Sequence, residues 1–296
     1  MPPPARRTRL LRSLGCLGLA VVVLLGLAVG GFALLRSRGL ADPSPFEPRC
    51  VAVANDLAVT ITPDQAHYTA IITGVSVERG LSPRAASIAM ATVYQETGIR
   101  NLDGGDRDSV GLFQQRPSQG WGTVEEIMDP YYSTGRFYDA LVEVDGWETG
   151  DINDVAQEVQ RSGYPEAYRD HEADARVLAS VFTGHSPAAL RCSHGELGRA
   201  DVDGLTESLT DTLGDLETTE APAGEDGTPA SLSVRAPRET LAWTVAAHAV
   251  ANAGRHGVQS VEVAGTTWTH DPDGLGEWLP SAATDPDAVR ITFTAG

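Results

Sequence analysis

The segment Ser82–Gly98 constrains the fold most strongly, because it is apolar on nearly every face of a helix. Ser82 is a good N-cap residue, Pro83 fits the first helical position, and Gly98 is a typical residue just beyond a helix end. A helix without a polar face must be surrounded by other elements, so we expect it at the centre of a folded domain. Glu96 then lies in the last turn of this buried helix.

The position of Glu96 predicts an unusual carboxyl group. The helix dipole disfavours a negative charge at the C-terminal end, and apolar surroundings disfavour it again, so we expect a raised pKa for Glu96. A carboxyl group that stays protonated near neutral pH can act as a general acid. The alternative is a solvated glutamate at a frayed helix end, without a chemical role.

A polar stretch after Glu96 favours the general acid. It consists of a Gly-rich loop followed by an amide-rich run and an aromatic residue suited to stacking on a sugar ring. We expect four of its side chains to bind substrate: Ser109, Gln114, Gln115 and Trp121. Its acidic residues Asp103, Asp106 and Asp108 are possible second carboxylates, since two-carboxylate glycosidases need a base or nucleophile besides the acid. The alternative for these three is a solvated loop.

The runs Glu96–Gly98 and Gly111–Gln115 resemble motifs of the lytic transglycosylase and goose-type lysozyme superfamily, in particular a form attached to cell-wall proteins of actinobacteria. The resemblance covers roughly residues 64–183. It departs from the better-known motifs at Thr97, where serine is usual, and at Phe113, where methionine is usual. The resemblance implies a lysozyme-like α domain that cleaves MurNAc–GlcNAc linkages of peptidoglycan and leaves a 1,6-anhydro product.

A second cleft wall is expected around residues 160–168. The stretch Gln160–Pro165 interrupts two helices with amide and aromatic groups, at the position of the second wall in the transglycosylases. The usual Ala-Tyr-Asn sequence of that wall is missing. Gln160, Tyr164 and Tyr168 are therefore expected to contact sugars, with a structural turn as the alternative.

Cys50 and Cys192 bracket the helical region and are expected to form a disulfide. In the loop-entropy model, a bridge between such distant residues destabilises the unfolded chain by about 4–5 kcal/mol. The alternative is a metal site, because His185, Cys192 and His194 lie close in sequence. Their spacing matches no standard zinc pattern, so we expect no metal and no cofactor.

The N-terminal region predicts a membrane anchor. Residues 1–13 are a basic tail, and Leu14–Leu35 is an uncharged apolar stretch long enough to cross a bilayer as one helix. The excess of arginine before this span predicts a cytoplasmic N-terminus. We therefore expect a single-pass protein of the cytoplasmic membrane, with residues 36–49 as a tether and the catalytic domain facing the cell wall. A cleaved signal peptide is the alternative.

Charge and composition limit the partners. The formal net charge is −18, which argues against nucleic acid as a partner, because the phosphate backbone requires a basic protein face. All 22 basic residues are arginine and none is lysine. Arginine codons can consist of G and C alone, whereas lysine codons cannot, so the composition indicates a bacterium with a GC-rich genome.

Between the cysteines the sequence predicts helices joined by short loops, and hence a mainly α catalytic domain over residues 50–195. Thr62 and Thr123 each begin a capping box. Asp129 precedes a proline that starts a helix, and Asp151 caps a helix through about Arg161. The last helix is expected from Pro165 to about Phe182.

The remainder of the chain is divided into two parts. Residues 196–233 combine many acidic residues with Gly, Pro and Thr, and they contain no basic residue from Asp201 onward, so we expect an extended acidic linker. Residues 234–296 are expected to form a small α+β module. It should contain a helix from Glu239 to about His256, a hairpin over 258–269 and a strand over 289–294.

These observations together predict a peptidoglycan-cleaving enzyme outside the cytoplasm, with Glu96 as general acid and glycan strands as substrate. The transglycosylase outcome is expected if no second carboxylate assists the acid. Lysozyme-type hydrolysis is the alternative within the same class. A non-catalytic wall-binding or secretion-scaffold protein with the same fold is the alternative from another class, and the retention of Glu96 argues against it.

Overall fold

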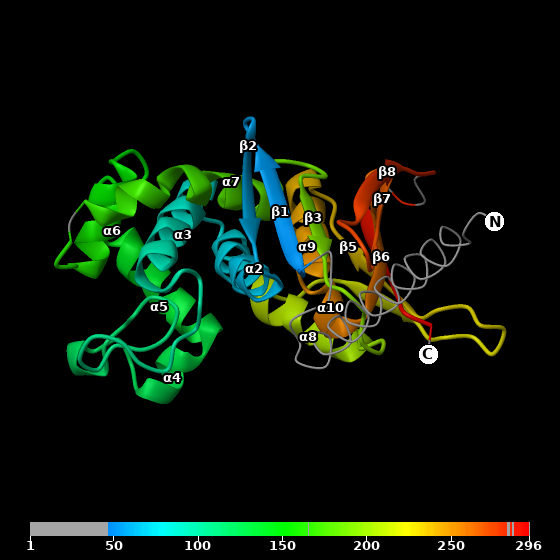
Figure 1. Ribbon diagram of the computed structural model, residues 1–296, viewed down its shortest axis with the longest axis horizontal. Helices are drawn as coiled ribbons and strands as arrows, with labels where there is room; N and C mark the ends of the chain where they lie inside the picture. Colours follow the sequence, from blue (N-terminus) through cyan, green and yellow to red (C-terminus); the bar gives the residue numbers. More distant parts are fainter. Residues whose placement is uncertain (1–46, 165, 283–284, 286, 296) are drawn as a thin grey trace, which may run out of the picture. The chain divides into compact units, whose positions relative to one another are not determined.

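Two antiparallel sheets and a set of helices form the described part of the chain, which comprises residues 47–164, 166–282, 285 and 287–295 of this computed structural model (Figure 1). The described residues are 43% helix and 20% strand. The expectation of a mainly α fold is therefore wrong, and the protein is of the α+β class.

The first sheet has the strand order β2-β1-β3. Its strands are β1 (Arg49–Ala54), β2 (Leu57–Ile61) and β3 (Leu190–Ser193). The β1–β2 hairpin turns at Asn55 and Asp56, whose φ angles are 50° and 62°. Two consecutive left-handed residues are what a tight hairpin requires, and Asn and Asp tolerate that conformation well. The sequence analysis did not predict this hairpin.

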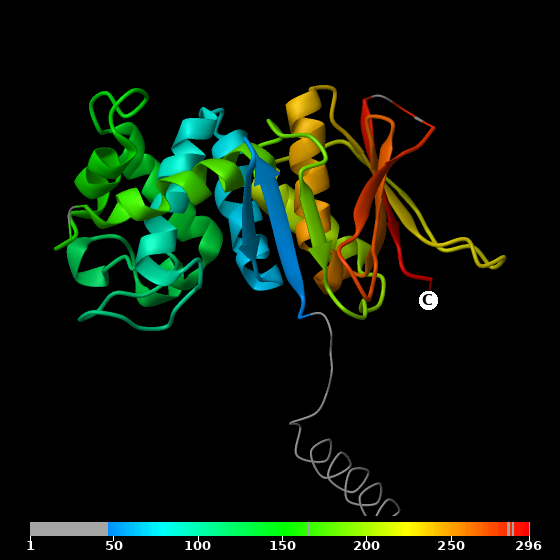
Figure 2. The same ribbon diagram turned by 45° about the horizontal axis from the view of Figure 1, so that its top comes forward.

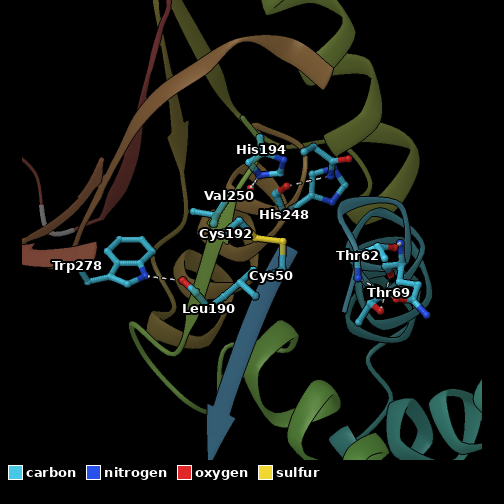
Figure 3. Close-up of a disulfide and its surroundings, with 11 residues drawn as sticks. Cys50, Thr62, Thr69, Leu190, Cys192, His194, His248, Val250 and Trp278 are labelled. Carbon is cyan, nitrogen blue, oxygen red and sulfur yellow. Dashed lines mark hydrogen bonds between the residues drawn. A yellow bond between two sulfur atoms is a disulfide. The ribbon is translucent and has the colours of Figure 1, made fainter. Parts of the chain in front are cut away.

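The expected disulfide between Cys50 and Cys192 is confirmed. The two residues are directly opposite in the β1–β3 register, and their Cα atoms are 4.0 Å apart. Figure 3 shows the bridge beside β3, near His194 and the hydrogen bond from Trp278 Nε1 to Leu190 O, which is 2.8 Å long. The bridge therefore connects the start of the described chain to a strand that lies 142 residues later in the sequence.

The buried central helix is α3 (Pro83–Thr97), and α2 (Pro63–Glu78) precedes it. All residues of α3 from Ala85 to Val93 are buried, as expected, because α2, α6 and α7 surround the helix. The Thr62 capping box is confirmed at the start of α2. Ser82 is at the N-cap position of α3, but its side chain makes no capping hydrogen bond.

The other helices of this region begin largely where the capping residues predict. They are α4 (Val124–Met128), α5 (Pro130–Val142), α6 (Ile152–Gln160) and α7 (Glu172–Phe182), with short 3-10 turns η1 (Pro117–Gln119) and η2 (Ala167–His171). Thr123, Asp129 and Asp151 each accept capping hydrogen bonds from the helix that follows. The expected last helix is instead divided into η2 and α7.

The expected acidic linker over residues 196–233 is wrong. This segment contains α8 (Val202–Leu213), β4 (Thr218–Ala221) and the start of β5 (Ser231–Arg235). Leu205, Leu209 and Leu213 are all buried on one face of α8, which packs against α2. Their spacing of four residues is the helical signal that the many surface carboxylates obscured.

The second sheet has the strand order β4-β5-β9-β6-β7-β8. Its remaining elements are β6 (Val258–Val263), β7 (Thr266–Thr269), β8 (Glu277–Pro280) and β9 (Ala288–Phe293), with helices α9 (Glu239–Ala251) and α10 (Ala253–His256). The expected hairpin and C-terminal strand are confirmed, and the expected helix is divided at Asn252.

Helix α9 joins the two halves of the described chain. It packs against α2, α7 and β3 on one side and against β6 and β9 on the other, and Figure 2 shows it between the two sheets. Nearly all of its residues are buried for this reason. The described residues consequently form one compact unit with a continuous apolar core.

The described residues give no support to the expectation of a single-pass membrane protein. Among the described residues, no helix combines the length and the apolarity needed to cross a bilayer. The predicted basic tail, the predicted span Leu14–Leu35 and nearly all of the predicted tether lie outside the described residues.

Candidate active site

Glu96 lies in the last turn of α3, where Gly98 ends the helix in the left-handed conformation with a φ of 62°. The residue is half-buried. Burial raises the pKa of its carboxyl group, while hydrogen bonds from Tyr168 and Gln160 lower it, and the net direction is upward. The helix dipole acts in the same direction as burial. The expected raised pKa is therefore found in the structure.

Tyr168 holds the acid in place. Its hydroxyl donates a hydrogen bond of 2.7 Å to Glu96 Oε1, and its ring is fully buried in η2. Burial and the neighbouring Glu96 carboxyl raise the pKa of Tyr168, so the hydroxyl remains a donor at neutral pH. The sequence analysis assigned Tyr168 to a sugar contact. In the structure it contacts the acid instead and is not part of the cleft lining.

A polar cleft of about 670 Å³ opens in front of Glu96. Its lining comes from Glu96, from the loop after α3 and from the segment that follows α6. The lining residues are Glu96, Asp106, Arg107, Ser109, Gln114, Gln115, Arg116, Gln119, Trp121, Gln160, Arg161, Ser162, Gly163 and Tyr164. The two walls expected from the sequence thus face one cleft.

The predicted glutamines line this cleft. They differ in how many of their amide atoms already have hydrogen-bond partners in the protein. Gln160 Nε2 donates to Phe113 O at 2.8 Å, which ties the second wall to the loop of the first. Gln115 is 2% exposed, and its Nε2 donates to Ser133 O at 3.0 Å. Its Oε1 is buried without a hydrogen-bond partner among the described residues, and this leaves an acceptor for a ligand or a water molecule.

Ser109 and Gln114 form a small hydrogen-bond network in the loop after α3. Ser109 Oγ lies 3.1 Å from Gln114 Oε1 and 2.7 Å from Asp106 O. Gln114 has a φ of 50°, in the left-handed region. A Cβ atom at Gly105 would lie 1.6 Å from Gln114 Oε1, so glycine at that position makes room for the amide.

Two of the three predicted aromatic residues, Trp121 and Tyr164, line the cleft. Trp121 packs partly against the core, and its carbonyl oxygen accepts a hydrogen bond of 3.3 Å from the Tyr132 hydroxyl. Tyr164 is 75% exposed, which is unusual for so large a side chain. Both rings are accessible from the cleft for stacking.

The three predicted carboxylates have three different environments. Asp103 is exposed and does not line the cleft, whereas Asp106 does line it. Asp108 accepts hydrogen bonds from Arg116 Nε at 2.8 Å and from the Ser118 backbone at 2.8 Å. These bonds hold the pKa of Asp108 well below its usual range, so this carboxyl group anchors the loop and does not exchange protons near neutral pH.

Several residues of the site were missed by the sequence analysis. Thr97 is 4% exposed, and its hydroxyl contacts Val93 O at 3.0 Å and Leu112 O at 2.9 Å, which connects the end of α3 to the amide-rich loop. The cleft also contains arginines at positions 107, 116 and 161. Thr97 could have been found from its position next to Glu96. No spacing in the sequence marks the arginines.

The alternative of a zinc site finds no support. Among the described residues, Cys50, Cys192 and His194 bring their potential ligand atoms within 4.8 Å of one another. However, the two sulfur atoms are bonded to each other, so neither offers a thiolate. His194 Nε2 lies 2.8 Å from Val250 O, and His185 Nδ1 lies 3.0 Å from the Thr183 hydroxyl.

No protein-family model matches the sequence. A comparison with curated proteins found no protein with significantly similar sequence.

Proposed function

We propose that the protein cleaves the glycan strands of peptidoglycan, with Glu96 as the general acid. The observation that carries the proposal is the Glu96 carboxyl group itself. It has a raised pKa, is held by the Tyr168 hydroxyl at 2.7 Å, and faces a polar cleft of about 670 Å³. This volume is within the range of about 300–1,000 Å³ that is typical of ligand pockets.

The cleft lining suits an amino-sugar polymer. Glutamine amides can bond to sugar hydroxyl and acetamido groups, and the Trp121 and Tyr164 rings offer faces for the sugars. The resemblance to the lytic transglycosylase superfamily supports peptidoglycan as the substrate class, because its motif residues Glu96 and Gln114 both lie in this cleft.

In the proposed reaction Glu96 protonates the glycosidic oxygen, and the bond to C1 of the muramic acid breaks. The 6-hydroxyl of the same sugar then attacks C1, and the Glu96 carboxylate accepts its proton. An intramolecular hydroxyl group that is already oriented outcompetes water by a large effective molarity. The products are a free hydroxyl end and a 1,6-anhydro-muramic end, so the enzyme would be a lytic transglycosylase.

Asp106 favours lysozyme-type hydrolysis as the second candidate function, because it is the one of the three predicted carboxylates that lines the cleft. A carboxylate opposite the acid would activate water or form a covalent intermediate, and the product would then carry a reducing end. The Asp106 side chain is 90% exposed and lies 3.8 Å from Arg107 Nε. It is thus solvated in the structure, and we favour the single-acid route.

The test is digestion of purified cell wall by the protein and by Glu96→Gln, followed by mass spectrometry of the released muropeptides. We expect anhydro-muramic products from the protein and a loss of at least about 100-fold in rate for Glu96→Gln, because general acid catalysis contributes about 10²–10⁴-fold. Glu158→Gln is the matched control, since Glu158 is an exposed residue of α6 outside the cleft. Near-normal turnover by Glu96→Gln would remove Glu96 from the mechanism.

The same digest separates the two outcomes. If the single-acid route is correct, Asp106→Asn keeps most of the activity and the anhydro ends remain. Reducing muramic ends, together with an Asp106→Asn loss as large as that of Glu96→Gln, would instead establish a two-carboxylate hydrolase.

A further inference from the structure

Three long polar side chains of the cleft are attached to left-handed backbone. Arg107, Gln114 and Arg161 have φ angles of 59°, 50° and 52°. Glycine and asparagine adopt this conformation readily, whereas an arginine or glutamine there costs free energy that glycine would avoid. Strained residues of this kind cluster at functional sites. The cleft therefore keeps side chains at positions where the backbone alone would favour glycine.

Arg161 is the clearest of the three. It is the C-cap residue of α6, a position at which glycine is common. The residue is exposed, and its side chain lies on the second wall of the cleft. Its guanidinium group has no ion pair or hydrogen bond with any residue in the described part of the chain, so its five N–H donors are available.

Arg107 lies on the loop after α3 and is also free to bind a ligand. Its side chain is 70% exposed, and its nearest carboxylate, Asp106, is 3.8 Å away in an exposed pair that contributes little. Arg116 differs, because its Nε donates to Asp108 at 2.8 Å. The cleft thus presents two uncommitted guanidinium groups, although the whole chain has a net charge of −18.

We propose that Arg107 and Arg161 bind a carboxylate carried by the glycan substrate. The guanidinium group matches the planar, two-oxygen geometry of a carboxylate. In peptidoglycan the carboxylate can belong to the stem peptide or, where the peptide is absent, to the lactyl group of muramic acid. The inference rests on the proposed function, and it makes the two arginines specificity residues that distinguish an acidic glycan from a neutral one.

Glycine substitutions test the proposal without damaging the fold. Arg107→Gly and Arg161→Gly remove the guanidinium groups and also relieve the left-handed strain, so each variant should melt at the same or a higher temperature. Ala264→Gly is the matched control, because Ala264 has a φ of 47° in the turn between β6 and β7 and does not line the cleft. It should show the same thermal behaviour and unchanged activity.

Three substrates identify the group that is bound: peptide-bearing peptidoglycan, amidase-treated glycan strands with free lactyl carboxylates, and neutral chitin oligosaccharides. We expect the double variant Arg107→Gly/Arg161→Gly to raise KM about tenfold or more on the first or second substrate with little change in kcat, and to leave the affinity for the chitin oligosaccharides unchanged. The substrate that shows the increase identifies the source of the carboxylate. Equal effects on all three substrates, or no effect on any, would overturn the proposal.

Binding separates this inference from the proposed function. Co-sedimentation with insoluble cell wall is measured in the Glu96→Gln background, with and without the two arginine substitutions. Binding that depends on the arginines supports the inference, even if the protein itself cleaves nothing. Normal cleavage by the protein and equal binding with and without the arginines would overturn the inference and leave the proposed function intact.

Discussion

At Glu96, two opposing influences set the protonation state of the carboxyl group. Burial at the end of α3 raises its pKa, and the hydrogen bonds from Tyr168 and Gln160 lower it. The bond from the Tyr168 hydroxyl, 2.7 Å long, also fixes the orientation of the carboxyl group. Tyr168 is therefore a positioning residue, which acts on the reaction through the acid.

Tyr168→Phe should consequently change the pH profile of the reaction. Loss of the hydroxyl removes a bond that lowers the pKa of Glu96, so the acid stays protonated to higher pH and the alkaline limb of the activity profile moves upward. We also expect kcat to fall roughly tenfold, because the carboxyl group is less well oriented. The measurement is kcat as a function of pH on solubilised glycan strands.

Tyr138→Phe is the matched control for this prediction. Tyr138 is also fully buried, and its hydroxyl donates to Ile72 O at 2.9 Å, away from the cleft. Both variants should lose on the order of 1 kcal/mol of stability. Only Tyr168→Phe should move the pH profile, and a similar shift in both variants would show that Tyr168 has no special relation to the acid.

Among the elements, the loop between α3 and α4 depends on a few specific contacts. Asp108 holds Arg116 and the Ser118 backbone, and Thr97 connects the loop to the end of α3. Without these contacts, a Gly-rich loop of this length would lose its conformation. The geometry of the cleft wall therefore depends on them.

Asp108→Asn should make this loop more sensitive to proteolysis. The substitution removes the ion pair with Arg116, and the exposed Arg107 side chain lies one residue before it in the sequence. Trypsin cleaves only after arginine here, since the chain contains no lysine, and cleavage after Arg107 should become faster. The site is identified by mass spectrometry of the fragments.

Asp103→Asn is the control for the loop prediction, because Asp103 is exposed on the same loop and has no ion pair among the described residues. Its cleavage rate should equal that of the unmodified protein. If trypsin cleaves Asp108→Asn no faster than the unmodified protein, the ion pair does not hold the loop.

For the whole molecule, the disulfide connects β1 to β3 and closes a loop that contains helices α2 to α7. Cys50→Ala/Cys192→Ala should lower the free energy of unfolding by about 4–5 kcal/mol in the loop-entropy model. Urea unfolding of the oxidised protein, the reduced protein and the double variant measures the difference. Identical midpoints for the oxidised and reduced protein would contradict the prediction, and the double variant should not respond to reductant.

Buried and half-buried histidines around α9 make the whole fold sensitive to acid. Burial lowers the pKa of His67 and of His194 to about 4 and that of His248 to about 3, from an ordinary value of 6.5. Because the folded state binds these protons less readily than the unfolded state, their stabilising effect is complete above about pH 6.5 and is lost as the pH falls toward 4. The loss is on the order of 3 kcal/mol each for His67 and His194.

We therefore expect the urea midpoint to fall steeply between pH 6.5 and 4.5, above the range in which most carboxyl groups titrate. His67→Gln should reduce this pH dependence, because glutamine does not titrate. Its amide can still bond to Asn252, whose Oδ1 lies 2.7 Å from His67 Nδ1. A midpoint that is constant down to pH 4.5 would show that these histidines are not buried in their neutral form.

The sequence alone predicted the features that depend on neighbouring residues. The capping residues Thr62, Thr123 and Asp151, the helix end at Gly98 and the 258–269 hairpin all match the structure, because a turn or cap is decided within a few residues. The raised pKa of Glu96 was also predicted, from its place at the end of an apolar helix, although its largest cause, burial, depends on the packing of distant segments. The disulfide was predicted because the chain has few cysteines to choose from.

The tertiary structure alone decided which distant segments pack together. The acidic composition of residues 196–233 suggested a linker, yet α8 forms there because Leu205, Leu209 and Leu213 bury against α2, more than 100 residues earlier in the chain. A Cβ atom at Gly74 would lie 2.2 Å from Thr212 Cγ2, so this close approach itself depends on a distant glycine. Tyr168 likewise became a partner of Glu96 and not a sugar contact through packing alone. Such contacts depend on three-dimensional proximity, which residue type and spacing along the chain do not determine.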